Sequence, residues 1–227
     1  MAAASGMMVR EKAISAYQPA TEEIFYPSED GKPVAETGVH YEYSVYFHNA
    51  LNYLYINDSD VYVAANNLVY YVEGDPKKCF SPDVYVVMGV PKGVRDNYLI
   101  WKEKGRVPNV VFEFTSKSTK HKDTVTKREL YRNLGVQEYF LYDPKGEYLN
   151  PRLIGLRLVN GRYQRIPLKN GRMFSQQLAL ELVLDEQGLR LYNPSTKEFL
   201  LRYDEVECKR VVAEIEEHIY VSTEQLS

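Results

Sequence analysis

The chain has 227 residues, 44% of them hydrophobic and 26% charged, and this balance excludes a chain that is disordered throughout. Its formal net charge of −3 excludes an overall positive field for nucleic acid, so such a contact would need a local basic patch. Cys79 and Cys208 have neither a disulfide framework nor zinc-ligand spacing, and no apolar run suits a signal peptide or a membrane span. We therefore expect a cytoplasmic protein without membrane contact.

The length suits one compact domain with additions at both ends. We expect a mobile N-terminal arm over residues 1–26, a domain over 27–203 and an acidic tail over 204–227. The domain would divide into a core, 34–145, and a hairpin layer, 146–203. A helical period indicates a first helix from about Val34 to Tyr55, with one stripe formed by Glu36, His40, Tyr43, Phe47, Leu51 and Leu54.

Several β-rich runs follow this helix. Residues 61–65 and 68–72, joined by a turn at Asn66-Asn67, and residues 83–88 are predicted to be strands of the sheet. Residues 89–107 are expected to cross one edge and cover it with aromatic side chains. Residues 109–115 form the most strand-like run, and its alternation places Glu113 and Thr115 on the face opposite Phe112.

A polar loop over 116–122 precedes a predicted helix, Asp123–Leu134, which Gly135 ends. Asp123 and Lys127 fall on its inward stripe, where a lysine is unusual. A side chain whose stem is buried while its ammonium reaches solvent, or an ion pair between Lys127 and Asp123, is the simple structural explanation. Residues 136–143 read as another strand, so that strand, helix and strand form a parallel βαβ unit.

Beyond Gly146, short alternating runs separated by Asn-Gly and Asn-Pro pairs predict antiparallel hairpins. The predicted fold class is therefore α/β (α+β): a mixed sheet flanked by helices, with an added antiparallel hairpin layer. The 20 tyrosines, the hairpin layer and the acidic helical tail favour a homo-oligomer, with a dimer as the favoured form.

The local basic patch lies between Lys117 and Arg132. It offers candidate nucleic-acid contacts, whereas a solvated helix face is the structural alternative. The contacts expected to reach DNA are Lys117, Lys120, Lys122 and Arg128.

Asp83, Glu113 and Lys127 combine the groups needed to hydrolyse a phosphodiester. Carboxylates suit Mg²⁺ or Mn²⁺, and a lysine can orient the attacking water or steady developing charge. A glutamate in mid-strand is costly to bury unless a cation or a salt bridge accompanies it, and both readings stay open.

Several motifs, taken together, resemble the restriction endonuclease family often called Uma-two, which is common in cyanobacteria and belongs to the PD-(D/E)XK nuclease superfamily. The resemblance extends to about Arg202 and implies a restriction-endonuclease-like fold. The matching residues are Tyr26-Pro27, Asp30-Gly31-Lys32-Pro33, Ala35-Glu36-Thr37, His40, Ser81-Pro82-Asp83, Val110 to Thr119, Asp123, Lys127, Tyr131, Gly135-Val136, Glu138-Tyr139 and Asp143-Pro144.

By this resemblance, Glu36, Asp83 and Glu113 are the metal ligands. The superfamily lysine would fall at Thr115, so Lys127 resembles a lysine that has moved to the next helix, and Lys117 is the second candidate. Supporting residues would be His40, Thr115, Lys117, Asp123 and Tyr131. The resemblance implies a divalent-metal-dependent DNA endonuclease; the alternative is a non-catalytic module of the same fold that binds nucleic acid or a protein.

Overall fold

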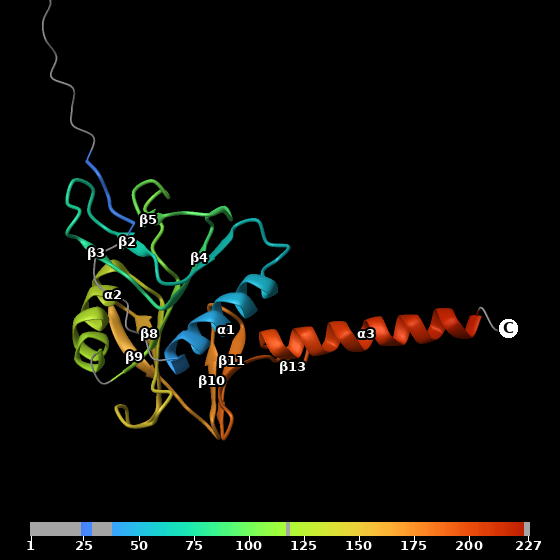
Figure 1. Cartoon of the computed structure of the whole chain (residues 1–227). Coiled ribbons are helices and arrows are strands. Elements are labelled where there is room, and N and C mark those ends of the chain that lie inside the picture. Colours follow the sequence, from blue (N-terminus) through green and yellow to red (C-terminus); the bar gives the residue numbers. More distant parts are fainter. Residues whose placement is uncertain (1–23, 29–37, 117–118, 225–227) are drawn as a thin grey trace, which may run out of the picture.

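The computed structural model describes residues 24–28, 38–116 and 119–224, with side chains in the last helix described as far as residue 216. A six-stranded mixed sheet forms its centre, in the order β1-β4-β6-β7-β8-β9 (Figure 1). Its strands are β1 (Val61–Ala64), β4 (Val84–Met88), β6 (Val110–Phe114), β7 (Glu138–Tyr142), β8 (Leu153–Val159) and β9 (Arg162–Ile166).

Within this sheet β6 and β7 are the parallel pair, and the other neighbours are antiparallel. The parallel pair needs a crossover, and a helical segment supplies it. Lys122–Lys127 form a π-helix that continues into α2 (Arg128–Leu134). Gly135 ends α2 with φ of 90°, the left-handed conformation that glycine adopts most readily. The predicted βαβ unit is thus confirmed.

Two smaller sheets complete the fold. A four-stranded antiparallel sheet contains β10 (Arg172–Ser175), β11 (Leu180–Asp185), β12 (Gly188–Asn193) and β13 (Glu198–Phe199). A three-stranded sheet contains β3 (Cys79–Phe80), β2 (Leu68–Tyr70) and β5 (Asn97–Leu99). The remaining helices are α1 (Gly38–Leu54) and α3 (Tyr203–Glu224).

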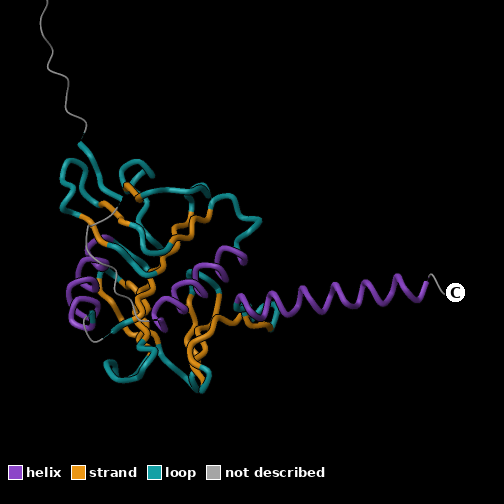
Figure 2. Tube along the Cα trace, viewed as in Figure 1, coloured by secondary structure: helices purple, strands orange, loops and turns teal. Residues whose placement is uncertain are grey.

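Each face of the central sheet has its own apolar core. On one face, α1 and strands β10–β12 pack against residues such as Phe112 and Phe140. On the other, α2 and the three-stranded sheet pack against residues such as Val111 and Tyr139. In the tube view, α1 and α2 lie on two sides of the central strands, and strands of the smaller sheets lie beyond them (Figure 2). Every residue of β6 and of β7 is buried, because both faces of these strands are covered.

Three predictions about the strands and helices need correction. Residues 68–72 were assigned to the main sheet, but β2 belongs to the three-stranded sheet. The Asn66 N–H donates to the Pro82 carbonyl, and β1 pairs with β4 rather than with β2. The helix predicted as Asp123–Leu134 is π-helical in its first half.

The third correction concerns the hairpins. An antiparallel layer is confirmed for β10–β13, but β8 and β9 continue the main sheet, because β8 pairs with β7. The N-terminal arm, the start of the first helix and Glu36 lie outside the described residues. No helix in the described ranges is long and apolar enough to cross a membrane.

Candidate active site

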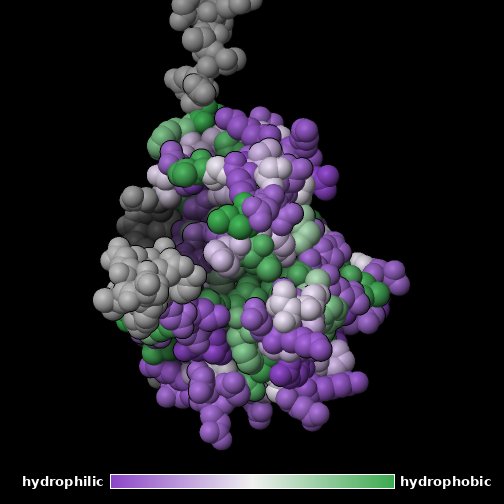
Figure 3. Space-filling model, turned by 90° about the vertical axis from the view of Figure 1, so that its right-hand side faces the viewer, coloured by the Kyte–Doolittle hydropathy of each residue, from purple (hydrophilic) through white to green (hydrophobic). Residues whose placement is uncertain are grey.

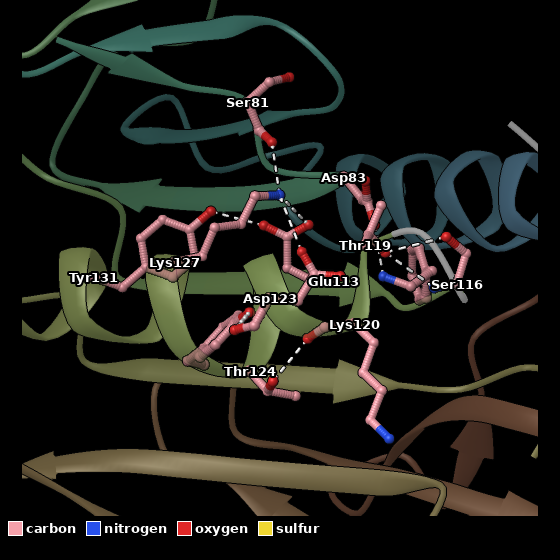
Figure 4. Close-up of polar contacts among 12 residues, drawn as sticks. Ser81, Asp83, Glu113, Ser116, Thr119, Lys120, Asp123, Thr124, Lys127 and Tyr131 are labelled. Carbon is pink, nitrogen blue, oxygen red and sulfur yellow. Dashed lines mark hydrogen bonds and ion pairs between the residues drawn. The ribbon is translucent and has the colours of Figure 1, made fainter. Parts of the chain in front are cut away.

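Glu113 is the centre of the site and is the fourth of the five residues of β6, near the end of the strand. Its side chain is only 1% exposed and points to the α2 side of the sheet, as the strand alternation predicts. One carboxylate oxygen accepts a hydrogen bond from the Tyr131 hydroxyl at 2.7 Å, and the other lies 2.7 Å from the Lys127 ammonium (Figure 4). Both oxygens are therefore engaged by donors from the crossover helix.

Lys127 reaches the site from the last residue of the π-helix. Its Nζ lies 3.6 Å from an Asp123 oxygen and donates to the Ser81 carbonyl at 3.1 Å, in addition to its contact with Glu113 (Figure 4). The expected Lys127–Asp123 pair is thus present, but Glu113 is the closer partner. A lysine buried to this degree needs such partners, because an isolated buried charge is very costly.

The π-helix explains how three side chains spaced four residues apart, those of Asp123, Lys127 and Tyr131, all face the site. In an α-helix, residues four apart drift around the axis, since one turn takes 3.6 residues. The wider π-turn offsets this drift over one step. Asp123, Lys127 and Tyr131 are consequently all buried on the same side.

Asp83 completes the described part of the site from the segment just before β4. Its Oδ2 accepts the Phe114 N–H at 2.6 Å and lies 2.9 Å from Nε2 of His40 on α1. The backbone of β6 and the first helix therefore fix this carboxylate. Asp83, Glu113 and Lys127 come together at one end of the central strands, as expected for a shared site.

The other predicted site residues are placed as follows. Thr115 is buried, and within the described residues its Oγ1 finds no hydrogen-bond partner. Its N–H donates to the Tyr142 carbonyl at 2.7 Å. Glu36 and Lys117 lie outside the described residues, so their expected roles stay predictions. Lys120, Lys122 and Arg128 are exposed on the surface of the crossover segment.

Negative charge exceeds positive charge around Lys127. Burial raises the pKa of the Glu113 carboxyl well above its usual value; Lys127 opposes this shift, while Asp83 and Asp123 add to it. Burial also raises the pKa of Asp123. Burial alone would lower the pKa of Lys127, but the charges of Glu113, Asp83 and Asp123 raise it overall. Because two donors meet the Glu113 oxygens, we assign Glu113 and Lys127 as an ion pair.

Sequence reasoning missed two contributors. The Ser81 carbonyl holds the Lys127 ammonium, and the Tyr139 hydroxyl donates to the Asp123 carbonyl at 2.9 Å. The Ser81-Pro82-Asp83 motif pointed to the segment but not to a backbone carbonyl. Tyr139 and Leu141 are two residues apart in β7, so their side chains lie on the same face of the sheet, the face toward α2. This alternation was the signal in the sequence that could have placed Tyr139 beside the helix.

The donor set fits a hard divalent cation. Asp83 and Glu113 provide carboxylate oxygens, and Mg²⁺ binds with only one or two carboxylates while keeping several waters. Three carboxylates around one ammonium also leave negative charge that a cation would balance. Among the described residues, however, no group of three or more His, Cys, Asp or Glu side chains is arranged to hold a metal.

Comparison with known proteins identifies the family. The model of the Uma2 family, described as "Putative restriction endonuclease", matches residues 18–189, which is more than half of the chain. The chain belongs to the Uma2 family. The match spans every described site residue from His40 to Tyr131. The resemblance seen in the sequence is thus confirmed, and Uma2 membership supports a restriction-endonuclease-like nuclease, a hydrolase, as the broad functional class.

The chain is also similar to a crystal structure from Anabaena variabilis ATCC 29413, described as "a putative nuclease belonging to DUF820". Sequence identity is 14%, the match covers 63% of this chain and 75% of the other, and the TM-score is 0.47. A search of curated proteins found no match. The assignment to Uma2 therefore rests on the family model.

Proposed function

We propose that the protein is a DNA endonuclease that hydrolyses phosphodiester bonds with Mg²⁺ or Mn²⁺. The observation that carries the proposal is the contact of 2.7 Å between Lys127 and Glu113, beside Asp83 at the same end of the sheet. This contact brings a lysine from the crossover helix to the acids, at a site where Thr115 occupies the position of the usual strand lysine. Family membership supports the nuclease class.

A bound divalent cation would neutralise charge on the phosphate and lower the pKa of a water that attacks it. Asp83 and Glu113 would hold this cation, together with Glu36. Phe114 and His40 orient the Asp83 carboxylate, which reduces the rearrangement needed for binding. Lys127 would then orient the attacking water or stabilise the developing negative charge.

The exposed cations of the crossover segment suit the DNA backbone. Lys120, Lys122 and Arg128 lie on the helix that also carries Lys127. Phosphate contacts of this kind position a nucleic acid without reading its sequence. We propose that they, together with Lys117, hold DNA near the acids, and that the functional unit is a homodimer.

The test is cleavage of plasmid DNA with Mg²⁺ or Mn²⁺ by the wild type and by Glu113→Gln. The substitution preserves the shape of the side chain but removes its charge, and we expect at least a 100-fold loss of rate, typical of a lost charge-stabilising group. Glu129→Gln on the exposed side of α2 is the matched control and should cleave like the wild type. Equal activity of Glu113→Gln and the wild type, or no activity with any metal and substrate, would contradict the proposal.

A second candidate is a non-catalytic module that binds nucleic acid or a protein partner. The full engagement of both Glu113 oxygens by Tyr131 and Lys127 favours this candidate, because a cation would have to displace or share those contacts. It predicts salt-dependent DNA binding that is the same for the wild type and Glu113→Gln, without cleavage by either. The absence of any DNA binding would count against the nuclease and against a module that binds nucleic acid.

A further inference from the structure

Helix α3 projects from the body of the molecule (Figure 1). Its first turn is tied down, since Glu205 accepts hydrogen bonds from Arg190 at 2.7 Å and from the Arg202 N–H at 2.8 Å. From Cys208 to Glu216 every residue is exposed. Helices draw most of their stability in proteins from packing on other elements, so this stretch lacks the usual support.

The projecting part of α3 carries a narrow apolar seam. Cys208, Val212 and Ile215 follow one another at intervals of four and three residues, the spacing of a coiled-coil seam. Val212 is 53% exposed and Ile215 is 52% exposed. These are large exposures for β-branched apolar side chains on one helix face, and they favour a helix as the partner.

A second apolar surface lies at the base of the helix. A groove of about 710 Å³ lies there between the end of α1 and the start of α3, and its lining includes Tyr53, Ile56, Phe199 and Val206. Figure 3 views the molecule from the side on which α3 projects and shows hydrophobic surface gathered in the middle of this face, framed by hydrophilic residues. A partner that covers the seam and reaches the base would bury both.

The charges of α3 are complementary to those of a second α3 that runs in the opposite direction. Lys209 precedes the centre of the seam and Glu216 follows it, and neither forms an ion pair within the described residues. In an antiparallel pair centred between Val212 and Ile215, Lys209 would lie within two residues, about 3 Å along the axis, of Glu216 of the second copy, twice by symmetry. A parallel pair would place like charges at the same height.

We propose that α3 forms an antiparallel two-helix interface with α3 of a second copy of this chain. A 22-residue helix is about 33 Å long, so the end of each helix would reach the groove at the base of the other. The proposal assigns the surface through which the proposed homodimer would form. It does not depend on the proposed hydrolysis of DNA.

Sedimentation of the full chain at micromolar concentration tests the interface. We expect the wild type to be a dimer and the double variant Val212→Glu/Ile215→Glu to be a monomer with an intact domain. Ala213→Glu adds a charge beside the seam and should remain a dimer. A wild type that is monomeric at every concentration, or equal disruption by Ala213→Glu, would overturn the proposal.

Charge exchange tests the direction of the helices. Lys209→Glu and Glu216→Lys should each raise the dissociation constant about five-fold, because each replaces two attractive contacts by repulsive ones. The double variant should restore the wild-type value. Failure of this restoration would contradict the antiparallel arrangement.

Cys208 gives an independent measure of direction. In the antiparallel pair the two Cys208 residues would be roughly 16 Å apart along the axis, given a rise of 1.5 Å per residue. A disulfide requires Cα atoms within about 7 Å, so mild oxidation should not link the dimer through Cys208. A cross-linked dimer that Cys208→Ser abolishes would show a parallel pair instead.

Discussion

Lys127 lies among oxygen atoms that come from three separate segments of the chain. Glu113 belongs to β6, Asp123 to the π-helix and the Ser81 carbonyl to the segment before β4. The ammonium in this position holds the three segments together. It stays protonated although it is buried, because the neighbouring carboxylates raise its pKa. The stability of the site and its chemistry are therefore linked through one side chain.

Replacing Lys127 by methionine should destabilise the fold. The substitution removes the cation but leaves Glu113 buried, and breaking one side of a buried ion pair costs about 3–5 kcal/mol. The free energy of unfolding in urea, measured with a metal chelator present, would give this value. Lys122→Met on the exposed side of the same helix should change it by less than about 0.5 kcal/mol.

The double variant Lys127→Met/Glu113→Gln separates this cause from a packing defect. With no charge left unpaired, it should recover part of the lost stability. A double variant as unstable as the sum of the two single variants would argue that packing, and not charge, holds Lys127 in place.

At the level of elements, a buried carboxylate joins two of the sheets. Glu138 of β7 is fully buried and contacts Arg157 of β8 at 2.8 Å. It also accepts a hydrogen bond from the Ser175 hydroxyl of β10 and from the Gln176 N–H at 3.0 Å. Through these contacts Glu138 links the four-stranded sheet to β7, the strand beside β6.

Glu138→Gln should weaken this junction. An amide in place of the carboxylate turns one acceptor into a donor that faces other donors, at a cost of about 2–3 kcal/mol. Urea unfolding should show this loss in a single transition, whereas Glu186→Gln on an exposed turn should leave stability unchanged. Two separate transitions in the variant would mean that the sheets unfold independently.

The sequence predicted those parts of the site that depend on local periodicity. Strand alternation placed Glu113 on the face toward α2, and the helical period placed Lys127 inward. The π-turn had no signal in residue type, and the assignment of β2 to a separate sheet depends on long-range pairing. Strand β10 was missed because Arg172 and Phe174 are exposed, and its fastening residue, Ser175, binds a partner far away in the sequence.

On the scale of the whole molecule, buried tyrosines carry much of the packing on the α2 face of the central sheet. Tyr85, Tyr131 and Tyr139 are almost fully buried, and burial raises the pKa of each well above its usual value. Burial raises the pKa of Tyr55 to about 12. These hydroxyl groups keep their protons in the folded state at a pH where the unfolded chain loses them.

The fold should therefore unfold cooperatively in alkali. Tyrosines in the unfolded chain ionise near pH 10. The folded pKa values are higher, so their stabilising contribution is complete below about pH 10 and is lost as the pH rises through the folded values. Circular dichroism and tyrosinate absorbance should change together above pH 10. Ionisation of the buried tyrosines without loss of structure would contradict this expectation.

The enclosure of β6 on both faces restricts how a long substrate would approach. Phe112 and Phe114 lie beneath α1 and the four-stranded sheet, and Val111 lies beneath the α2 side. Neither face of the strand offers a surface on which a polymer could lie flat. A DNA duplex bound to Lys120 and Lys122 would instead cross the ends of the central strands. It would then present a single backbone phosphate at a time to Asp83 and Glu113.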